Sequence, residues 1–112
     1  MVSVVLEGES MDAYYFKDHI IEELDGAKEY IVRAQECKAD NCMTWAKAFV
    51  DMSAKELEHA AELFKMFNEY YKQFDDRPDL RSYMEPFRNE LTTDYMRYSS
   101  QVKYMHEMYN RT

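Results

Sequence analysis

The sequence predicts an all-α protein, and three observations carry this prediction. The 112 residues include only two glycines and two prolines, so few residues interrupt helical structure. Three long segments repeat apolar residues every three or four positions, which is the period of an amphipathic helix. The connections between these segments are short, and short connections join antiparallel helices. We expect one helical domain over residues 1–112, with helices at about 11–37, 41–74 and 79–110.

Residues 1–9 are expected to form an extended or disordered arm. The run VSVVL has β-branched character, but Gly8 follows it, so we expect no sheet within the domain. The arm reaches Glu7 without the basic stretch of a signal peptide, and no segment approaches the ~20 apolar residues of a membrane span. These features predict a cytoplasmic protein, free or enclosed in a protein compartment.

The first helix carries a carboxylate among its apolar residues. Glu23 lies on the predicted buried stripe, and Tyr30, two turns later, borders it and is placed to offer its hydroxyl to a buried carboxylate. Gly26 lies mid-helix, where it costs about 1 kcal/mol relative to alanine, so it either marks the close approach of another helix or is a tolerated accident. The apolar members of the stripe are Phe16, Ile20, Leu24, Ala27, Ile31 and Ala34.

The second helix repeats this anomaly with two polar side chains. Glu56 and His59 fall inside a predicted stripe, and their i, i+3 spacing directs both side chains to one point. A buried carboxylate costs several kcal/mol unless it is compensated. The pair therefore indicates either a site for a divalent transition metal or a buried hydrogen-bonded pair. The apolar members of this stripe are Trp45, Phe49, Met52, Leu63, Phe67 and Tyr70.

The third helix is predicted to be a packing surface. The segment DDRPD separates it from the second helix, because the residue before Pro78 is disfavoured in the helical region. No acid interrupts the centre of its stripe, Asp94 and His106 lie only at the borders, and there is no second Glu-x-x-His. Its apolar stripe comprises Leu80, Met84, Phe87, Leu91, Tyr95, Tyr98, Val102, Met105 and Tyr109.

Together, Glu23-x6-Tyr30 and Glu56-x-x-His59 resemble the ferritin-like di-iron proteins. The runs EELDGAKEYIVRAQEC and ELEHA are most similar to the short encapsulated ferritins and more distantly to rubrerythrin, over about residues 20–67. The resemblance implies a ferritin-like antiparallel helical hairpin plus a third long helix. It also implies Glu23 as a terminal ligand, Glu56 as a bridging carboxylate, His59 as the nitrogen ligand, and Tyr30 as an outer residue supporting them.

The complete family site needs twice these ligands, whereas this chain offers Glu23, Glu56 and His59 once. Unless Asp94 and His106 substitute, a second copy must complete the site across a two-fold axis, giving a four-helix metal-binding bundle. Four carboxylates would then balance two divalent cations. We expect a homodimer or higher homo-oligomer holding two iron ions per dimer, with manganese or zinc as alternatives.

Cys37 and Cys42 flank the turn KADN between the first two helices. They are placed to bridge across it, but two reduced loop thiols are the expected state in a reducing compartment. A zinc-ribbon site is excluded because there is no second cysteine pair.

The leading function is a di-iron ferroxidase, which oxidises Fe(II) with O₂ or peroxide and uses Glu23, Glu56 and His59 as its catalytic metal ligands. The alternative is a non-enzymatic ferritin-like assembly protein with a structural or vestigial metal site. A net charge of −8 argues against nucleic acid or an anionic membrane as partner. An encapsulin shell is a possible compartment, although the tail MHEMYNRT contains no apolar docking peptide.

Overall fold

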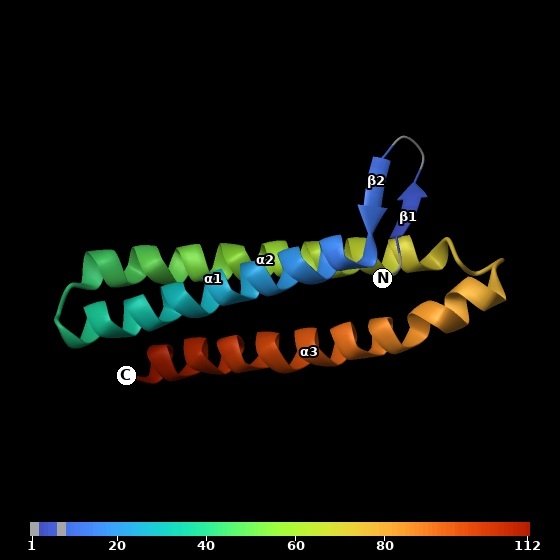
Figure 1. The fold of residues 1–112 in the computed structure, drawn as a ribbon. Coiled ribbons are helices and arrows are strands. Elements are labelled where there is room, and N and C mark those ends of the chain that lie inside the picture. Colours follow the sequence, from blue (N-terminus) through green and yellow to red (C-terminus); the bar gives the residue numbers. More distant parts are fainter. Residues whose placement is uncertain (1–2, 7–8) are drawn as a thin grey trace.

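The computed structural model describes residues 3–6 and 9–112, with side chains from Ala13 onward. Three helices make up most of this part of the chain: α1 (Ala13–Ala39), α2 (Met43–Lys72) and α3 (Pro78–Arg111). α1 and α2 form an antiparallel hairpin, and α3 returns along it in the direction of α1 (Figure 1). The all-α prediction is confirmed at this level, and the helices begin and end close to the expected residues.

The molecule is elongated. Its principal extents are 56 × 26 × 19 Å, and its radius of gyration is 17.2 Å. A compact domain of this length has a radius of gyration of about 13 Å. The difference arises because three helices lie side by side in one direction, so much of each helix keeps an open face.

A small β-hairpin precedes α1. β1 (Ser3–Leu6) pairs antiparallel with β2 (Glu9–Asp12), with Val4 opposite Met11 and Val5 opposite Ser10. The expectation that this arm forms no sheet is therefore wrong. A strand forms only where another segment pairs with it, and here Glu9–Asp12 supplies the pairing partner. Because β2 reaches Asp12, α1 begins two residues later than expected.

The turn between α1 and α2 satisfies the last carbonyls of α1. The Asn41 N–H donates to the Lys38 carbonyl at 3.1 Å, and the Cys42 N–H donates to the Cys37 carbonyl at 2.8 Å. Asn41 adopts φ = 60°, a left-handed conformation that asparagine tolerates. This is a Schellman motif, and it reverses the chain within a few residues.

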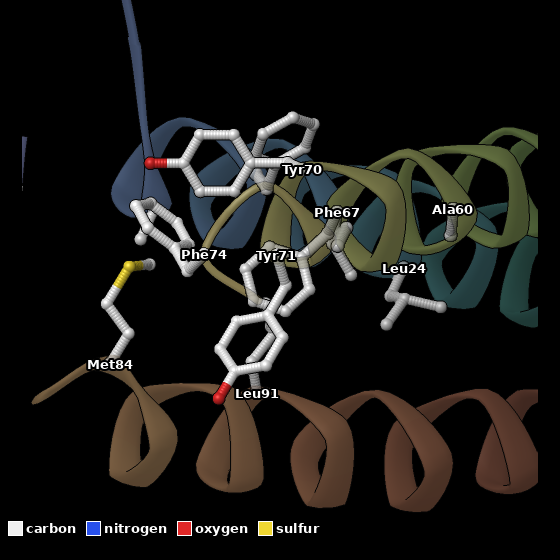
Figure 2. Packing of buried hydrophobic residues seen from close by; sticks show 11 residues of the cluster. Leu24, Ala60, Phe67, Tyr70, Tyr71, Phe74, Met84 and Leu91 are labelled. Carbon is white, nitrogen blue, oxygen red and sulfur yellow. The ribbon is translucent and has the colours of Figure 1, made fainter. Parts of the chain in front are cut away.

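The larger apolar cluster lies where α2 ends and α3 begins (Figure 2). Phe67 and Tyr71 of α2 and Phe74 of the following turn pack there with Met84 and Leu91 of α3. A second cluster lies toward the other end of the helices, where Ala27, Ile31, Ala34, Ala46, Val102 and Tyr109 are buried. Every apolar residue predicted for the buried stripe of α1 is buried, so that prediction is confirmed.

The predicted stripe of α2 is only partly correct. Phe67 and Tyr70 are buried, but Trp45 is 66% exposed and Met52 is 40% exposed. The line that packs into the protein instead recurs every seven residues as Ala46, Ser53, Ala60 and Phe67. Small residues on that line allow α2 to lie close to α1, and the larger apolar residues are left on a neighbouring face. α2 therefore has two apolar faces, only one of which is covered within the chain.

Polar contacts also fasten α3 to the hairpin. The Tyr98 hydroxyl donates to the Asp25 carboxylate at 2.5 Å, and the Lys38 ammonium donates to the Tyr109 carbonyl at 2.7 Å. The buried Ser53 hydroxyl donates to the Ala27 carbonyl at 2.6 Å and lies 2.8 Å from His106 Nε2. Because the hydroxyl proton is already used, His106 donates its Nε2 proton to Ser53, which joins all three helices at one point.

No helix in the described part of the chain combines the length and apolar character that crossing a membrane requires.

Candidate metal site

The structure brings Glu23, Glu56 and His59 together. Glu23 projects from α1, and the other two project from neighbouring turns of α2. His59 Nδ1 lies 3.6 Å from Glu23 Oε2 and 3.8 Å from Glu56 Oε1. One donor atom from each residue lies within 4.8 Å of the other two. The antiparallel hairpin thus brings together side chains more than thirty positions apart in the sequence.

The three side chains lie at the surface of the hairpin, at different depths. The side chains of Glu23 and Glu56 are 27% and 26% exposed, whereas that of His59 is 59% exposed. The carboxylates therefore line the floor of the site, and the imidazole stands at its rim. His59 is not part of a covered core face, contrary to the expectation from the sequence, because it shares the exposed face of α2 with Trp45 and Met52.

Gly26 makes the room that Glu56 occupies. A Cβ atom placed on Gly26 would lie 2.7 Å from Glu56 Oε2, closer than real Cβ contacts allow. The sequence left open whether this glycine marks a close approach or is a tolerated accident, and the structure shows a close approach by the Glu56 carboxylate. A mid-helix glycine costs about 1 kcal/mol relative to alanine, so its position beside the site has a stability cost.

The site holds more negative charge than its own residues balance. The pKa of Glu56 is raised to about 7, mainly by a hydrogen bond with Glu23, then by partial burial and the Glu23 charge; His59 acts in the opposite direction. Such a hydrogen bond requires a proton between the two carboxyl groups. A cation that displaces this proton would satisfy both carboxylates.

The donor set and its spacing fit a divalent first-row ion. Ligand atoms about 2.1 Å from one ion lie about 3.0–4.2 Å from one another, so the two imidazole–carboxylate separations already fall in that range. Two carboxylates and one imidazole suit iron, manganese or zinc. Three donors leave further coordination positions open.

The other residues considered for the site are placed elsewhere. Asp94 pairs with Arg97 at 3.0 Å, and His106 contacts Ser53, so among the described residues α3 adds no donor to the cluster. The Tyr30 ring stacks on Phe49 with centroids 6.1 Å apart. Within the described residues, its hydroxyl makes no hydrogen bond to Glu23 or Glu56, and its supporting role stays a prediction.

The sequence predicted that the apolar stripe around Glu56 and His59 is buried, but in the structure most of it forms an open seam that contains the site, and only Tyr70 at its end is buried. Its positions follow alternating four- and three-residue steps along α2: Trp45, Phe49, Met52, Glu56, His59, Leu63, Met66 and Tyr70. Met66 is 46% exposed, and beside it lies a groove of about 410 Å³ lined by apolar Phe16, Met66 and Tyr70 and by polar residues of α2 and its C-terminal cap. The signal was the regular spacing itself, which continues through Met66 and predicts a helix-to-helix contact.

Comparison with protein-family models, with curated proteins and with solved structures finds no match to this chain. The likeness to ferritin-like proteins therefore remains an expectation that rests on the residues named above.

Proposed function

We propose that this protein is a ferritin-like, di-iron ferroxidase that binds Fe(II) at a site shared between two chains and oxidises it with O₂ or peroxide. The observation that carries the proposal is the convergence of Glu23, Glu56 and His59 on one point of the hairpin surface. Fe(II) is the substrate, and two ferrous ions supply one electron each. With peroxide, two Fe(II) and two protons give two Fe(III) and two waters.

Each chain supplies half of the donors that a dinuclear site requires. Two copies related by a two-fold axis would contribute four carboxylates and two imidazoles, and the four negative charges would balance two divalent cations. The raised pKa of Glu56 supports this arrangement. It means that Glu23 and Glu56 do not readily carry two negative charges together without a proton, and a bound cation could take the place of that proton. Glu56 interacts with Glu23 through a hydrogen bond and lies 3.8 Å from His59, which is consistent with the bridging role that the resemblance implies for it.

The seam on α2 supports one position for the proposed two-fold axis. An axis between Glu56 and His59 sets each apolar seam residue against another apolar residue of the second copy: Trp45 against Tyr70, Phe49 against Met66, and Met52 against Leu63. It also sets Glu56 against His59, so the polar residues meet one another. The exposed indole of Trp45 then falls at the groove formed by Phe16, Met66 and Tyr70. An exposed aromatic residue opposite an apolar groove is typical of an interface anchor.

The chain's own residues would do three things in the reaction. Glu56 gives up the proton shared with Glu23 when an ion enters, so binding and deprotonation occur together. His59, at the exposed rim, supplies the nitrogen donor facing incoming ions. The closed seam would exclude bulk water from the apolar surroundings of the ions.

The test adds Fe(II) anaerobically to metal-free protein, admits air, and follows Fe(III) formation by near-ultraviolet absorbance with the mass measured in parallel. We expect rapid oxidation with about two irons per dimer in the parent protein, and oxidation at the background rate in Glu56→Gln and His59→Ala. Glu58→Gln is the matched control, because Glu58 is an exposed acid of the same helix. Background-rate oxidation in the parent protein would refute the ferroxidase.

The open seam favours one alternative, a non-enzymatic helical assembly protein in which metal only fastens two chains together. In that case zinc would support the dimer as well as iron does, and a chelator would dissociate it. The ferroxidase predicts instead that zinc occupies the site and blocks iron oxidation.

A further inference from the structure

The turn between α1 and α2 places two cysteines at a specific pair of positions. In a Schellman motif, the side chain that follows the left-handed residue meets the side chain in the last turn of the helix, and this contact is usually hydrophobic. Asn41 is the left-handed residue here, and the two meeting positions are Cys42 and Cys37. Two thiols therefore stand where the motif brings side chains together.

The backbone hydrogen bond limits how far apart these residues can be. Cys42 N lies 2.8 Å from the Cys37 carbonyl oxygen. A carbonyl oxygen lies about 2.4 Å from its own Cα, and an amide nitrogen lies about 1.5 Å from its own Cα. The two Cα atoms are therefore at most about 6.7 Å apart, within the range of about 4.4–6.8 Å found in disulfides. The backbone of the turn therefore meets the Cα distance that a disulfide requires, and the Cys42 thiol, which points to the Asp40 carbonyl at 3.7 Å, has to rotate towards Cys37.

The two thiols differ in access. Cys42 is exposed and lies at the start of α2, where its side chain makes no capping hydrogen bond to the helix. Cys37 is half-buried and packs against the apolar cluster of α1, α2 and α3. Both are free cysteines. A solvent oxidant meets Cys42 first, and Cys37 is held next to it as the second thiol.

We propose that Cys37 and Cys42 are a redox modification site, which a peroxide converts to an intramolecular disulfide across the α1–α2 turn. The Cys42 thiolate attacks one peroxide oxygen and keeps it as a sulfenic acid, while the O–O bond breaks and the other oxygen leaves as hydroxide, which takes up a proton to become water. The Cys37 sulfur then attacks the Cys42 sulfur, the S–O bond breaks, and a second water leaves. The two thiols lose two electrons and two protons, and the peroxide becomes two waters.

The test treats dilute, metal-free full-length protein with hydrogen peroxide, traps the remaining thiols with a maleimide, and measures intact mass and peptide maps. The Glu56→Gln variant provides a background in which bound iron cannot contribute, so the result stands apart from the proposed ferroxidase. We expect loss of both thiols together, loss of two hydrogens in mass, a Cys37–Cys42 linked peptide, and full recovery with a thiol reductant.

Two pairs of variants make the test specific. Cys37→Ser should stop at an oxygen adduct on Cys42, and Cys42→Ser should lose its remaining thiol several-fold more slowly than the parent protein. Asn41→Gly keeps the left-handed turn and should oxidise at the parent rate, whereas Asn41→Val disfavours it and should oxidise more slowly. Two thiols that still titrate after peroxide, oxygen adducts in place of the linked peptide, or a disulfide between chains would each overturn the proposal.

Discussion

Glu56 is the residue at which the main constraints of the site meet. Its carboxylate occupies space left by Gly26, shares a proton with Glu23, and lies 3.8 Å from His59. Each contact comes from a different requirement: space, charge and ligand geometry. Each requirement can be tested separately.

The first concerns the space beside Gly26. Gly26→Ala should weaken metal binding by roughly tenfold or more, because the new Cβ would lie 2.7 Å from Glu56 Oε2 and the carboxylate must move. Zinc titration by calorimetry measures this effect. The control is the same change in a Glu56→Ala background, where no carboxylate is displaced and thermal unfolding should show a gain of about 1 kcal/mol. An equal gain in thermal stability from Gly26→Ala in the parent protein and in the Glu56→Ala background would contradict the contact between Gly26 and Glu56.

The second concerns pH. The folded protein holds the Glu56 proton up to a pKa of about 7, whereas the unfolded chain releases it near 4.5. The contribution to stability is therefore fully present below pH 4.5 and is lost as pH rises through about 7. Metal-free protein should have a lower Tm at pH 8 than at pH 5, and Glu56→Gln should reduce this difference. Metal affinity should change in the opposite direction and strengthen over the same range. A Tm that rises with pH equally in both proteins would contradict the shared proton.

At the scale of single elements, α2 differs from its neighbours because it has two apolar faces. The buried residues of α1 were predicted correctly, since that helix has a single apolar stripe. Periodicity alone could not say which face of α2 packs inward, and Trp45 was assigned to the wrong one. Glu23, Glu56 and His59 could be singled out because they are polar on apolar stripes. The contact of Gly26 with Glu56 could not be predicted from the sequence, because it depends on the register between α1 and α2.

The exposed face of α2 can be tested through Trp45, the single tryptophan of the chain. Trp45→Ser should weaken the proposed dimer roughly tenfold or more, because an aromatic anchor would be lost from an apolar groove. Sedimentation measures the association, and shielding of the indole from acrylamide in the parent protein reports the contact. Met96→Ser is the control, because Met96 is 58% exposed on α3, away from the seam. Equal effects of the two substitutions would place the interface elsewhere.

The inward face of α2 depends on Ser53, where three helices meet. Ser53→Ala should destabilise the protein by about 1–3 kcal/mol, because the Ala27 carbonyl and His106 Nε2 would lose their common partner in a buried setting. Chemical denaturation measures the change. Ser100→Ala, an exposed serine of α3, should change stability by less than about 0.5 kcal/mol. Metal affinity should be retained in both variants.

At the scale of the whole molecule, the order and length of the three helices could be predicted because helical periodicity and chain breaks are local signals. The β-hairpin could not be predicted in this way, because a strand forms only where another segment pairs with it. The elongated shape also escaped prediction, since it depends on how α3 lies along the hairpin: it packs mainly on α1 and leaves one face of α1 and α2 open. Glu23, Glu56 and His59 lie on that open face.

That open face makes concentration a control on the proposed chemistry. With three donors on each chain, formation of a complete site is a second-order event, so its rate rises with the square of the chain concentration. Dilution would separate the chains and abolish the complete site without any inhibitor, and confining many copies in a small volume would restore it. Iron itself, by stabilising the pair of chains, would lower the concentration at which the change occurs.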